Sequence, residues 1–131
     1  GYLDGPGFSF SHRRLSIVGL ADGKQPIGNE EGSVQVIFNG ELYDYPERRD
    51  ELIKKGHRFR THTDTEIIPH LWEEHGIQFF DKLKGQFAFA LWDAKQHEFV
   101  LARDRFGILP LYWTIQKHEG TEWLLFASEI R

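Results

Sequence analysis

The sequence contains no cysteine and no methionine. Without cysteine, its 131 residues can form no disulfide bond, no thiolate metal site and no thiol nucleophile. Natural reading frames begin with methionine, so we expect a chain that runs from Gly1 to Arg131 to be a segment of a longer protein. No apolar run approaches the roughly 20 residues that span a bilayer, and no signal-peptide pattern opens the chain. We therefore expect a cytoplasmic protein with no membrane partner.

The chain also lacks an excess of positive charge, since its formal net charge is -4 at pH 7. Surfaces that bind nucleic acid need clustered Lys and Arg, so we expect no nucleic-acid partner. Aromatic residues are abundant, with 11 Phe and 4 Trp, and this indicates a large apolar interior. The length suits one domain built around such an interior.

Short strands dominate the secondary structure that the sequence predicts. Apolar and β-branched patterns place them at 8–11, 15–18, 34–38, 86–92, 98–102, 111–115 and 122–127, with turns or loops at 1–7 and 21–32. The strand at 86–92 is apolar at both odd and even positions, which is typical of a strand covered on both faces. Sequential strands with short links indicate an antiparallel sheet, and hence an α+β fold of stacked layers.

Two helices are expected in the middle of the chain. Asp44 is placed to cap the first, with Pro46 in its first turn and Gly56 just beyond its end. The second, over 63–75, opens with the capping-box spacing of Thr63-Asp64-Thr65-Glu66.

Asn39-Gly40 has two interpretations. Between two strand-like runs, Asn-Gly predicts a hairpin turn, because both residues accept positive φ. The functional interpretation is an oxyanion hole, in which the Asn39 amide and the backbone N–H of Gly40 face one developing negative charge.

Other polar residues are equally open to two interpretations. Arg13-Arg14 predicts either a solvated strand edge or a surface ion pair. In the functional interpretation, one of the two guanidinium groups binds the carboxylate of a ligand. The negative charge of Asp64 either interacts favourably with the helix dipole or binds the ammonium group of a ligand. In the charged turn at 103–107, Arg–Asp ion pairs either stabilise the loop or belong to a functional site.

The seven histidines predict no metal site. His57 and His62, or His70 and His75, do not have a known ligand spacing. Glu66 and His70 are four apart, and this spacing favours a surface pair on a helix.

Longer motifs, in their order along the chain, resemble the glutamine amidotransferase domain of glutamine-hydrolysing asparagine synthetases, a class II (N-terminal-nucleophile) family. The matching segments are 12–18, 25–26, 38–43, 63–66, 83–90, 103–107, 110–112 and 126–130. The motifs at 14–17, 39–43 and 85–90 resemble this family more than they resemble amidotransferases that act on purine precursors or hexosamine. The family fold is a four-layer αββα sandwich of antiparallel sheets, and its reaction converts glutamine to glutamate and ammonia.

The resemblance implies a set of site residues. Arg14 would bind the glutamine α-carboxylate beside backbone groups of Ile17 and Val18. Asn39 and Gly40 would form the oxyanion hole. Glu41 and Asp64 would hold the α-ammonium group.

The chain departs from the family pattern at its start. The family nucleophile is a cysteine at the mature N-terminus, so the chain is expected to begin several tens of residues after it and to lack the first strand and helix. Asp44 also stands where many relatives have Asn. The chain alone is therefore expected to be inactive.

The expected partners are L-glutamine and a C-terminal synthetase domain of the same full-length chain, with a homodimer left open. No cofactor is expected in this domain, while ATP and Mg²⁺ would belong to the synthetase domain, which most commonly makes asparagine from aspartate. The alternative is a pseudo-amidotransferase without a nucleophile, acting as a glutamine-binding or structural module. A β-rich domain with coincidental motifs is a third interpretation.

Overall fold

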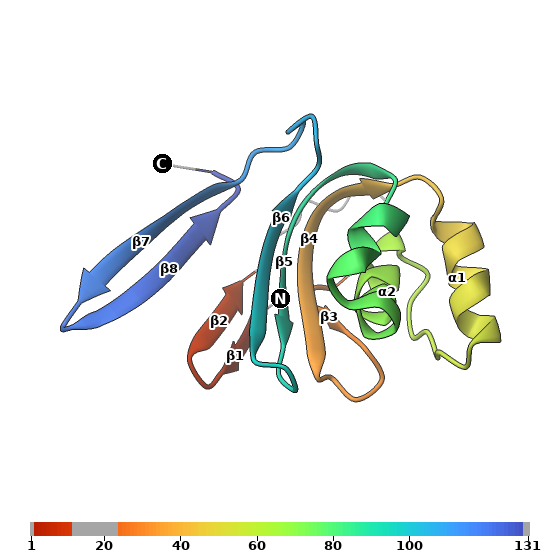
Figure 1. Cartoon of the computed structure of the whole chain (residues 1–131), viewed down its shortest axis with the longest axis horizontal. Helices are drawn as coiled ribbons and strands as arrows, with labels where there is room; N and C mark the ends of the chain where they lie inside the picture. Colours follow the sequence, from red (N-terminus) through yellow and green to blue (C-terminus); the bar gives the residue numbers. More distant parts are fainter. Residues whose placement is uncertain (1, 12–23, 130–131) are drawn as a thin grey trace.

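The computed structural model describes residues 2–11 and 24–129 (Figure 1). Its strands are β1 (Tyr2–Gly5), β2 (Phe8–Ser11), β3 (Ile27–Gly28), β4 (Val34–Leu42), β5 (Gly85–Asp93), β6 (Glu98–Arg103), β7 (Tyr112–His118) and β8 (Thr121–Ala127). Its helices are α1 (Tyr45–Lys54) and α2 (Ile67–His75), with 3₁₀ turns η1 (Asp64–Glu66) and η2 (Gly76–Lys82). The two α-helices and the predicted strands at 8–11, 34–38, 86–92, 98–102, 111–115 and 122–127 are confirmed, with bounds that shift by up to four residues.

The centre of the fold is a four-stranded sheet in the order β3-β4-β5-β6. Every pair in it is antiparallel, with Phe38 opposite Phe89 and Asn39 opposite Ala88 in the long β4–β5 ladder. This confirms the predicted α+β class with antiparallel strands.

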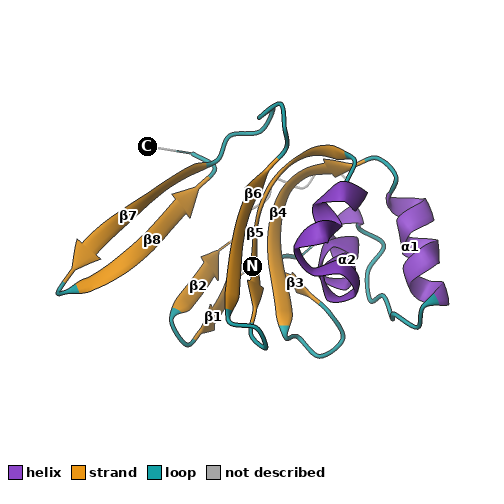
Figure 2. Ribbon diagram, in the orientation of Figure 1, coloured by secondary structure: helices purple, strands orange, loops and turns teal. Residues whose placement is uncertain are grey.

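One face of this sheet is covered by the helices (Figure 2). Alternate residues of β4 and β5 point to that face, since side chains on a strand alternate between faces. The buried side chains of this core include Val34, Val36, Phe38, Phe87, Phe89, Leu91, Ile67, Ile68, Leu71 and Trp72. The predicted apolar face of the second helix is therefore confirmed, and the Trp72 indole N–H donates to Asp93 Oδ2 at 2.7 Å across the layer boundary.

The opposite face carries the β1–β2 hairpin. The Phe8 ring lies 5.0 Å from Trp92, and the Phe10 ring lies 6.0 Å from Phe99, measured between ring centroids. Ala90 on this face is 1% exposed, so the prediction that the strand at 86–92 is covered on both faces is confirmed. The β7–β8 hairpin extends away from these layers (Figure 1).

The described residues thus form a helical layer, a four-stranded sheet and two further hairpins on the other side. A second helical layer of the expected αββα sandwich does not occur among residues 2–11 and 24–129. In the same described ranges, no helix combines the length and apolar character needed to cross a bilayer.

The hairpin predicted at Asn39-Gly40 is wrong. Strand β4 continues without a break from Val34 to Leu42, and both residues pair with β5. Local sequence favours a turn here, but pairing with a distant strand overrides that preference. The β5 ladder is a contact of long sequence separation, which the dipeptide cannot reveal.

The turn predicted over 1–7 is also too long. Tyr2–Gly5 forms β1 and pairs with β2, so that the turn is confined to Pro6 and Gly7. Leu15–Val18, the remaining predicted strand, lies outside the described residues.

Within the described residues, the predicted capping interactions at the N-termini of the two helices do not form. Asp44 occupies the N-cap position of α1 without a side-chain cap, and its Oδ2 instead accepts from Arg48 Nε at 3.2 Å. The capping box at Thr63 is absent as well. Its Glu66 carboxylate turns away and accepts from the backbone N–H groups of Arg60 and Thr61, both at 2.7 Å.

Candidate glutamine site and a histidine–carboxylate cluster

A cavity of about 570 Å³ lies over the sheet face that the helices leave open. Four of the residues singled out by sequence line it: Asn39, Gly40, Glu41 and Asp64. Its volume falls in the range of sites that hold small molecules. The cavity is therefore the candidate binding site.

Strand alternation explains how β4 contributes to the cavity. Ile37, Asn39 and Glu41 share the face opposite the apolar core, and all three line the cavity. Directly across the ladder from Asn39 stands Ala88, which also lines the cavity. This small side chain leaves room above the sheet, so the Asn39 amide is exposed to the cavity. Within the described residues that side chain forms no hydrogen bond.

The backbone N–H of Gly40 faces the free edge of β4. Phe38 N donates to Gln25 Oε1 at 2.6 Å, and Leu42 N donates to Asp64 Oδ2 at 2.8 Å, both on the side away from β5. Since alternate N–H groups of a strand point to the same side, the Gly40 N–H lies between these two anchored positions. Asn39 and Gly40 both line the cavity, and each contributes a neutral N–H donor. Neutral donors of this kind are the groups that stabilise an oxyanion.

Gln25 holds this edge in place, a role that the sequence alone does not predict. Its side chain is 3% exposed, and its Nε2 lies 3.5 Å from Thr65 Oγ1 while its Oε1 accepts from Phe38 N. The amide thus connects β4 to η1, the turn that carries Asp64. Only the fold reveals this role, because the contact spans 40 residues.

Asp64 lies in η1 and is half-buried at the cavity wall. One of its carboxylate oxygens is occupied by the Leu42 N–H. Glu41, one residue earlier on β4, is exposed. Two carboxylates on one side of the cavity suit a cationic group of a ligand.

The turn after β6 forms another wall of the cavity through Leu109, Pro110 and Leu111. Arg103 fixes this turn by donating to the carbonyl oxygens of Leu109 at 2.5 Å and Gly107 at 2.6 Å. The hydrogen bonds of this charged turn therefore run to backbone groups rather than between Arg and Asp.

Asp104 holds the start of the same turn. Its carboxylate accepts from the backbone N–H groups of Phe87 at 3.1 Å and Phe106 at 2.9 Å. Burial would raise the pKa of Asp104, but these N–H groups outweigh that cost and hold the pKa below its ordinary value. Asp104 thereby stays charged and keeps the wall in position.

Arg14, Ile17 and Val18 lie outside the described residues. Their assignment to the α-carboxylate stays a prediction. Ser11, the last described residue before them, lines the cavity.

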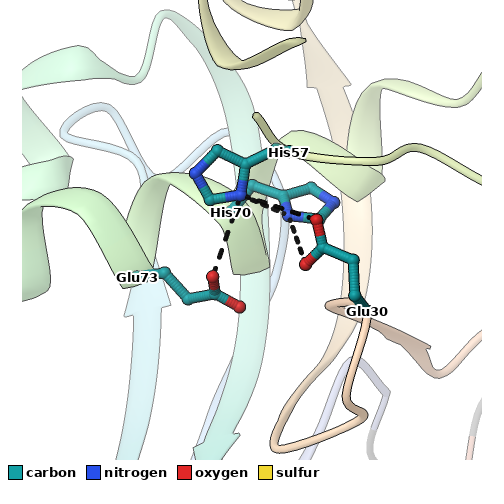
Figure 3. Close-up of side chains that lie close together, drawn as sticks. All are labelled: Glu30, His57, His70 and Glu73. Atoms are coloured by element: carbon teal, nitrogen blue, oxygen red, sulfur yellow. Dashed lines mark hydrogen bonds and ion pairs between the residues drawn. The ribbon is translucent and has the colours of Figure 1, made fainter. Parts of the chain in front are cut away.

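A second polar cluster lies on the helical side of the sheet, and Figure 3 shows its four central side chains. Ligand-type atoms of Glu30, His57, His70 and Glu73 lie within 4.8 Å of one another. The expectation of a surface pair between Glu66 and His70 is wrong, because these residues are only 1% and 0% exposed.

The Glu66 carboxylate lies beside this cluster and is strongly acidic. Burial would raise the pKa of Glu66, but the His70 imidazole 3.8 Å away, the Thr61 hydroxyl and the backbone N–H groups of Arg60 and Thr61 lower it to about 2. The spacing of histidines along the chain cannot reveal this group, because its members come from a loop, a turn and α2 and meet only in the folded structure.

Solved structures with a similar fold are amidotransferases. The chain matches glutamine phosphoribosylpyrophosphate (PRPP) amidotransferase from B. subtilis, solved with ADP and GMP, with a TM-score of 0.68 and 25% identity, over 88% of this chain and 26% of that one. It also shares the fold of an allosteric regulatory enzyme of purine biosynthesis, with a TM-score of 0.62, 23% identity, and coverage of 78% and 23%. The fold is thus that of class II amidotransferase domains.

The family model described as "Glutamine amidotransferase domain" matches residues 1–131, and the chain belongs to this family. Asparagine synthetase [glutamine-hydrolyzing] 2 of Bacillus subtilis is 50% identical over 93% of the chain, which covers 16% of that protein. Asparagine synthetase [glutamine-hydrolyzing] 3 of Arabidopsis thaliana is 46% identical over 92% of the chain, which covers 20% of it. The chain therefore spans about a fifth or less of the length of these two relatives.

Proposed function

We propose that the cavity over β4 and β5 binds L-glutamine and that the full-length protein hydrolyses its side-chain amide. The observation that carries this proposal is the meeting of Asn39, Gly40, Glu41 and Asp64 in one cavity. These residues come from a strand and from a turn more than 20 residues away, and the fold brings together a pair of neutral donors and a pair of carboxylates.

The chemistry of glutamine suits this arrangement. Glu41 and Asp64 would hold the α-ammonium group, and Arg14 would hold the α-carboxylate through its guanidinium. The side-chain amide would then lie near Asn39 and the Gly40 N–H. When a nucleophile attacks the amide carbon, the carbonyl oxygen becomes negative and both donors stabilise it. The C–N bond breaks, ammonia leaves, and water hydrolyses the acyl intermediate to glutamate.

If the nucleophile is a cysteine, as the resemblance to the family implies, it comes from outside these 131 residues, since they contain none. By resemblance to the family it is a cysteine at the mature N-terminus, with its own α-amine as the base. This chain by itself would then bind glutamine without hydrolysing it.

We further propose that the ammonia serves an ATP-dependent amide synthesis, with aspartate converted to asparagine. The printed names of the relatives in Bacillus subtilis and Arabidopsis thaliana support this, since both are glutamine-hydrolysing asparagine synthetases. ATP and Mg²⁺ would bind a synthetase domain elsewhere in the full-length chain. The cytoplasmic location and the homodimer stay predictions.

The β7–β8 hairpin is a suitable contact for that synthetase domain. Trp113, Ile115, Trp123, Leu124 and Leu125 are between 41% and 62% exposed. Apolar side chains gathered on one exposed element typically mark a surface that another part of a protein covers.

The lack of cysteine in these residues is equally compatible with a second candidate, a glutamine-binding module without a nucleophile. Both candidates predict glutamine binding, and they differ in hydrolysis alone.

Replacing Arg14 by alanine tests the proposed binding mode. In the full-length protein, loss of the guanidinium leaves the α-carboxylate of glutamine without its counter-charge, at a cost of roughly 2–5 kcal/mol. We therefore expect the KM for glutamine, measured by steady-state release of glutamate, to rise by about 30-fold or more. Arg13→Ala is the matched control and should bind glutamine as the wild type does. Equal binding by Arg14→Ala and wild type, or the larger loss in Arg13→Ala, contradicts the assignment.

A further inference from the structure

We propose that Glu30, His57, His70 and Glu73 form a structural site for a divalent metal ion of the zinc type. The site lies on the helical side of the sheet, away from the proposed glutamine cavity, and does not depend on the proposed function. Glu30 comes from the β3–β4 loop, His57 from the segment after α1, and His70 and Glu73 from α2 (Figure 3).

The distances suit tetrahedral coordination. His57 Nδ1 and His70 Nδ1 lie 3.1 Å apart. Two imidazole nitrogens bound to one tetrahedral Zn²⁺ at 2.0–2.1 Å would lie about 3.3 Å apart. Glu30 Oε2 is 3.5 Å from His70 Nδ1, and Glu73 Oε2 is 3.8 Å from His57 Nδ1. All the proposed ligand atoms lie within 4.8 Å of one another. The Glu30 and Glu73 side chains are 31% and 32% exposed, so their carboxylates can move closer to the rings when an ion binds.

The protonation of the two rings supports a metal ion between them. Each neutral imidazole has one N–H and one lone pair. His57 Nε2 lies 2.6 Å from Glu74 Oε1 and therefore carries the N–H. His70 Nε2 forms no hydrogen bond within the described residues, but the negative Glu66 carboxylate 3.8 Å away favours an N–H over a lone pair there. Both Nδ1 atoms then present lone pairs to each other at 3.1 Å, and either a metal ion between them or a second proton on His57 removes the repulsion.

A proton between the two Nδ1 atoms is the alternative to a metal ion. If His70 donates that proton, its buried Nε2 becomes a lone pair facing the Glu66 carboxylate. If His57 donates it, His57 is an imidazolium that donates to both Glu74 and His70, and this is the metal-free state that Zn²⁺ would displace. Among the described residues, His70 Nε2 has no hydrogen-bond partner. Protonating both rings fully would place two N–H groups head to head at 3.1 Å.

Surrounding groups orient the proposed ligands as they do in metal proteins. Histidine ligands commonly direct their second ring nitrogen at a carboxylate, and Glu74 Oε1 takes that position 2.6 Å from His57 Nε2, while Glu66 Oε1 lies 3.8 Å from His70 Nε2. Asn29 Nδ2 donates to Glu73 Oε1, and the Arg58 N–H donates to Glu30 Oε1 at 2.7 Å. The Glu73 oxygen that Asn29 contacts differs from the one nearest His57, whereas Glu30 Oε1 also lies 3.8 Å from His57 Nδ1.

An ion can reach the cluster from the surface. Glu30 and Glu73 line a cavity of about 700 Å³ on this side of the molecule. Four protein ligands would close the coordination sphere, which is typical of a structural rather than a catalytic site. The ion would tie α2 to the β3–β4 loop and to the segment that follows α1.

Zinc binding by the full-length protein tests the site. After treatment with a chelator, we expect the protein to take up Zn²⁺ in competition with a chromophoric chelator, and to give the absorption of tetrahedral Co²⁺ when Co²⁺ is added instead. Glu73→Gln, an exposed and nearly isosteric change, should weaken Zn²⁺ binding by at least the roughly 10–100-fold that loss of an outer-shell partner costs, as should His57→Gln.

Glu31→Gln is the matched control, because Glu31 neighbours Glu30 but pairs with Lys95 at 2.5 Å. It should bind Zn²⁺ as the wild type does, and circular dichroism should show that all three variants fold. No Zn²⁺ uptake by the wild type, or equal uptake by wild type and both cluster variants, overturns the proposal. Glutamine binding serves as an independent readout, since it is expected to survive in Glu73→Gln whichever way the zinc result falls.

Discussion

Replacing Asn39 by alanine is expected to lower kcat for glutamine hydrolysis by the full-length protein about 10²–10³-fold. The Asn39 amide is exposed in the cavity and, within the described residues, forms no hydrogen bond. It is therefore free to donate when negative charge develops on the substrate oxygen. Because that charge exists mainly in the transition state, KM should change little. Steady-state release of glutamate measures both constants.

A matched control lies on the same strand. Gln35 shares the face of Asn39 on β4 but bonds the Gly32 carbonyl oxygen at 3.1 Å and does not line the cavity. Gln35→Ala should therefore retain the wild-type kcat. An Asn39→Ala enzyme with unchanged kcat, or with the loss confined to KM, contradicts an oxyanion role for this side chain.

Replacing Gly40 by alanine is expected to destabilise the domain by about 3 kcal/mol or more. Gly40 has a φ of 140°, which L-residues rarely adopt, and an added Cβ would lie 2.1 Å from the Gln86 carbonyl oxygen and 2.8 Å from Phe87 Cα. Both contacts are with backbone atoms of β5, so a side-chain rotation cannot relieve them. Proteolysis across a urea series, applied to the full-length protein, measures the loss.

Gly56→Ala separates the steric clash from the φ penalty. Gly56 also has a positive φ, 98°, but an added Cβ would meet no atom within 4 Å. Its cost should be about 1 kcal/mol. Equal losses in the two variants would show that the close approach of β4 and β5 at Gly40 does not matter.

The sequence predicts those helices and strands whose apolar pattern lies within the element itself. The helix over 63–75 was found because Ile67, Ile68, Leu71 and Trp72 recur at helical spacing, and all four are buried. The strand at 86–92 was found because its apolar residues leave no polar face. Such patterns reflect burial, and burial decided these elements in the structure as well.

Predictions failed where distant contacts decided the local structure. Asn39-Gly40 would suit a hairpin, yet β5 on one side and the side chains of Gln25 and Asp64 on the other keep β4 extended. Glu66 has the spacing of a capping residue, but it satisfies the N–H groups of Arg60 and Thr61 instead. Neither partner can be inferred from the motif itself.

The two sites differ in how far sequence could predict them. Asn39, Gly40, Glu41 and Asp64 were identified through motifs that resemble a family, and the fold brings them into one cavity. The group of Glu30, His57, His70 and Glu73 has no such motif, because its members span 43 residues with irregular spacing. Only the packing of α2 against the β3–β4 loop assembles it.

The most direct test of the account is the release of glutamate from L-glutamine by the full-length protein, measured in the presence of ATP and Mg²⁺, first without and then with aspartate. We predict glutamate and ammonia in equal amounts in the absence of aspartate, and asparagine in place of free ammonia when it is added. A folded full-length protein that binds glutamine but leaves it intact would contradict hydrolysis and favour a binding module without a nucleophile.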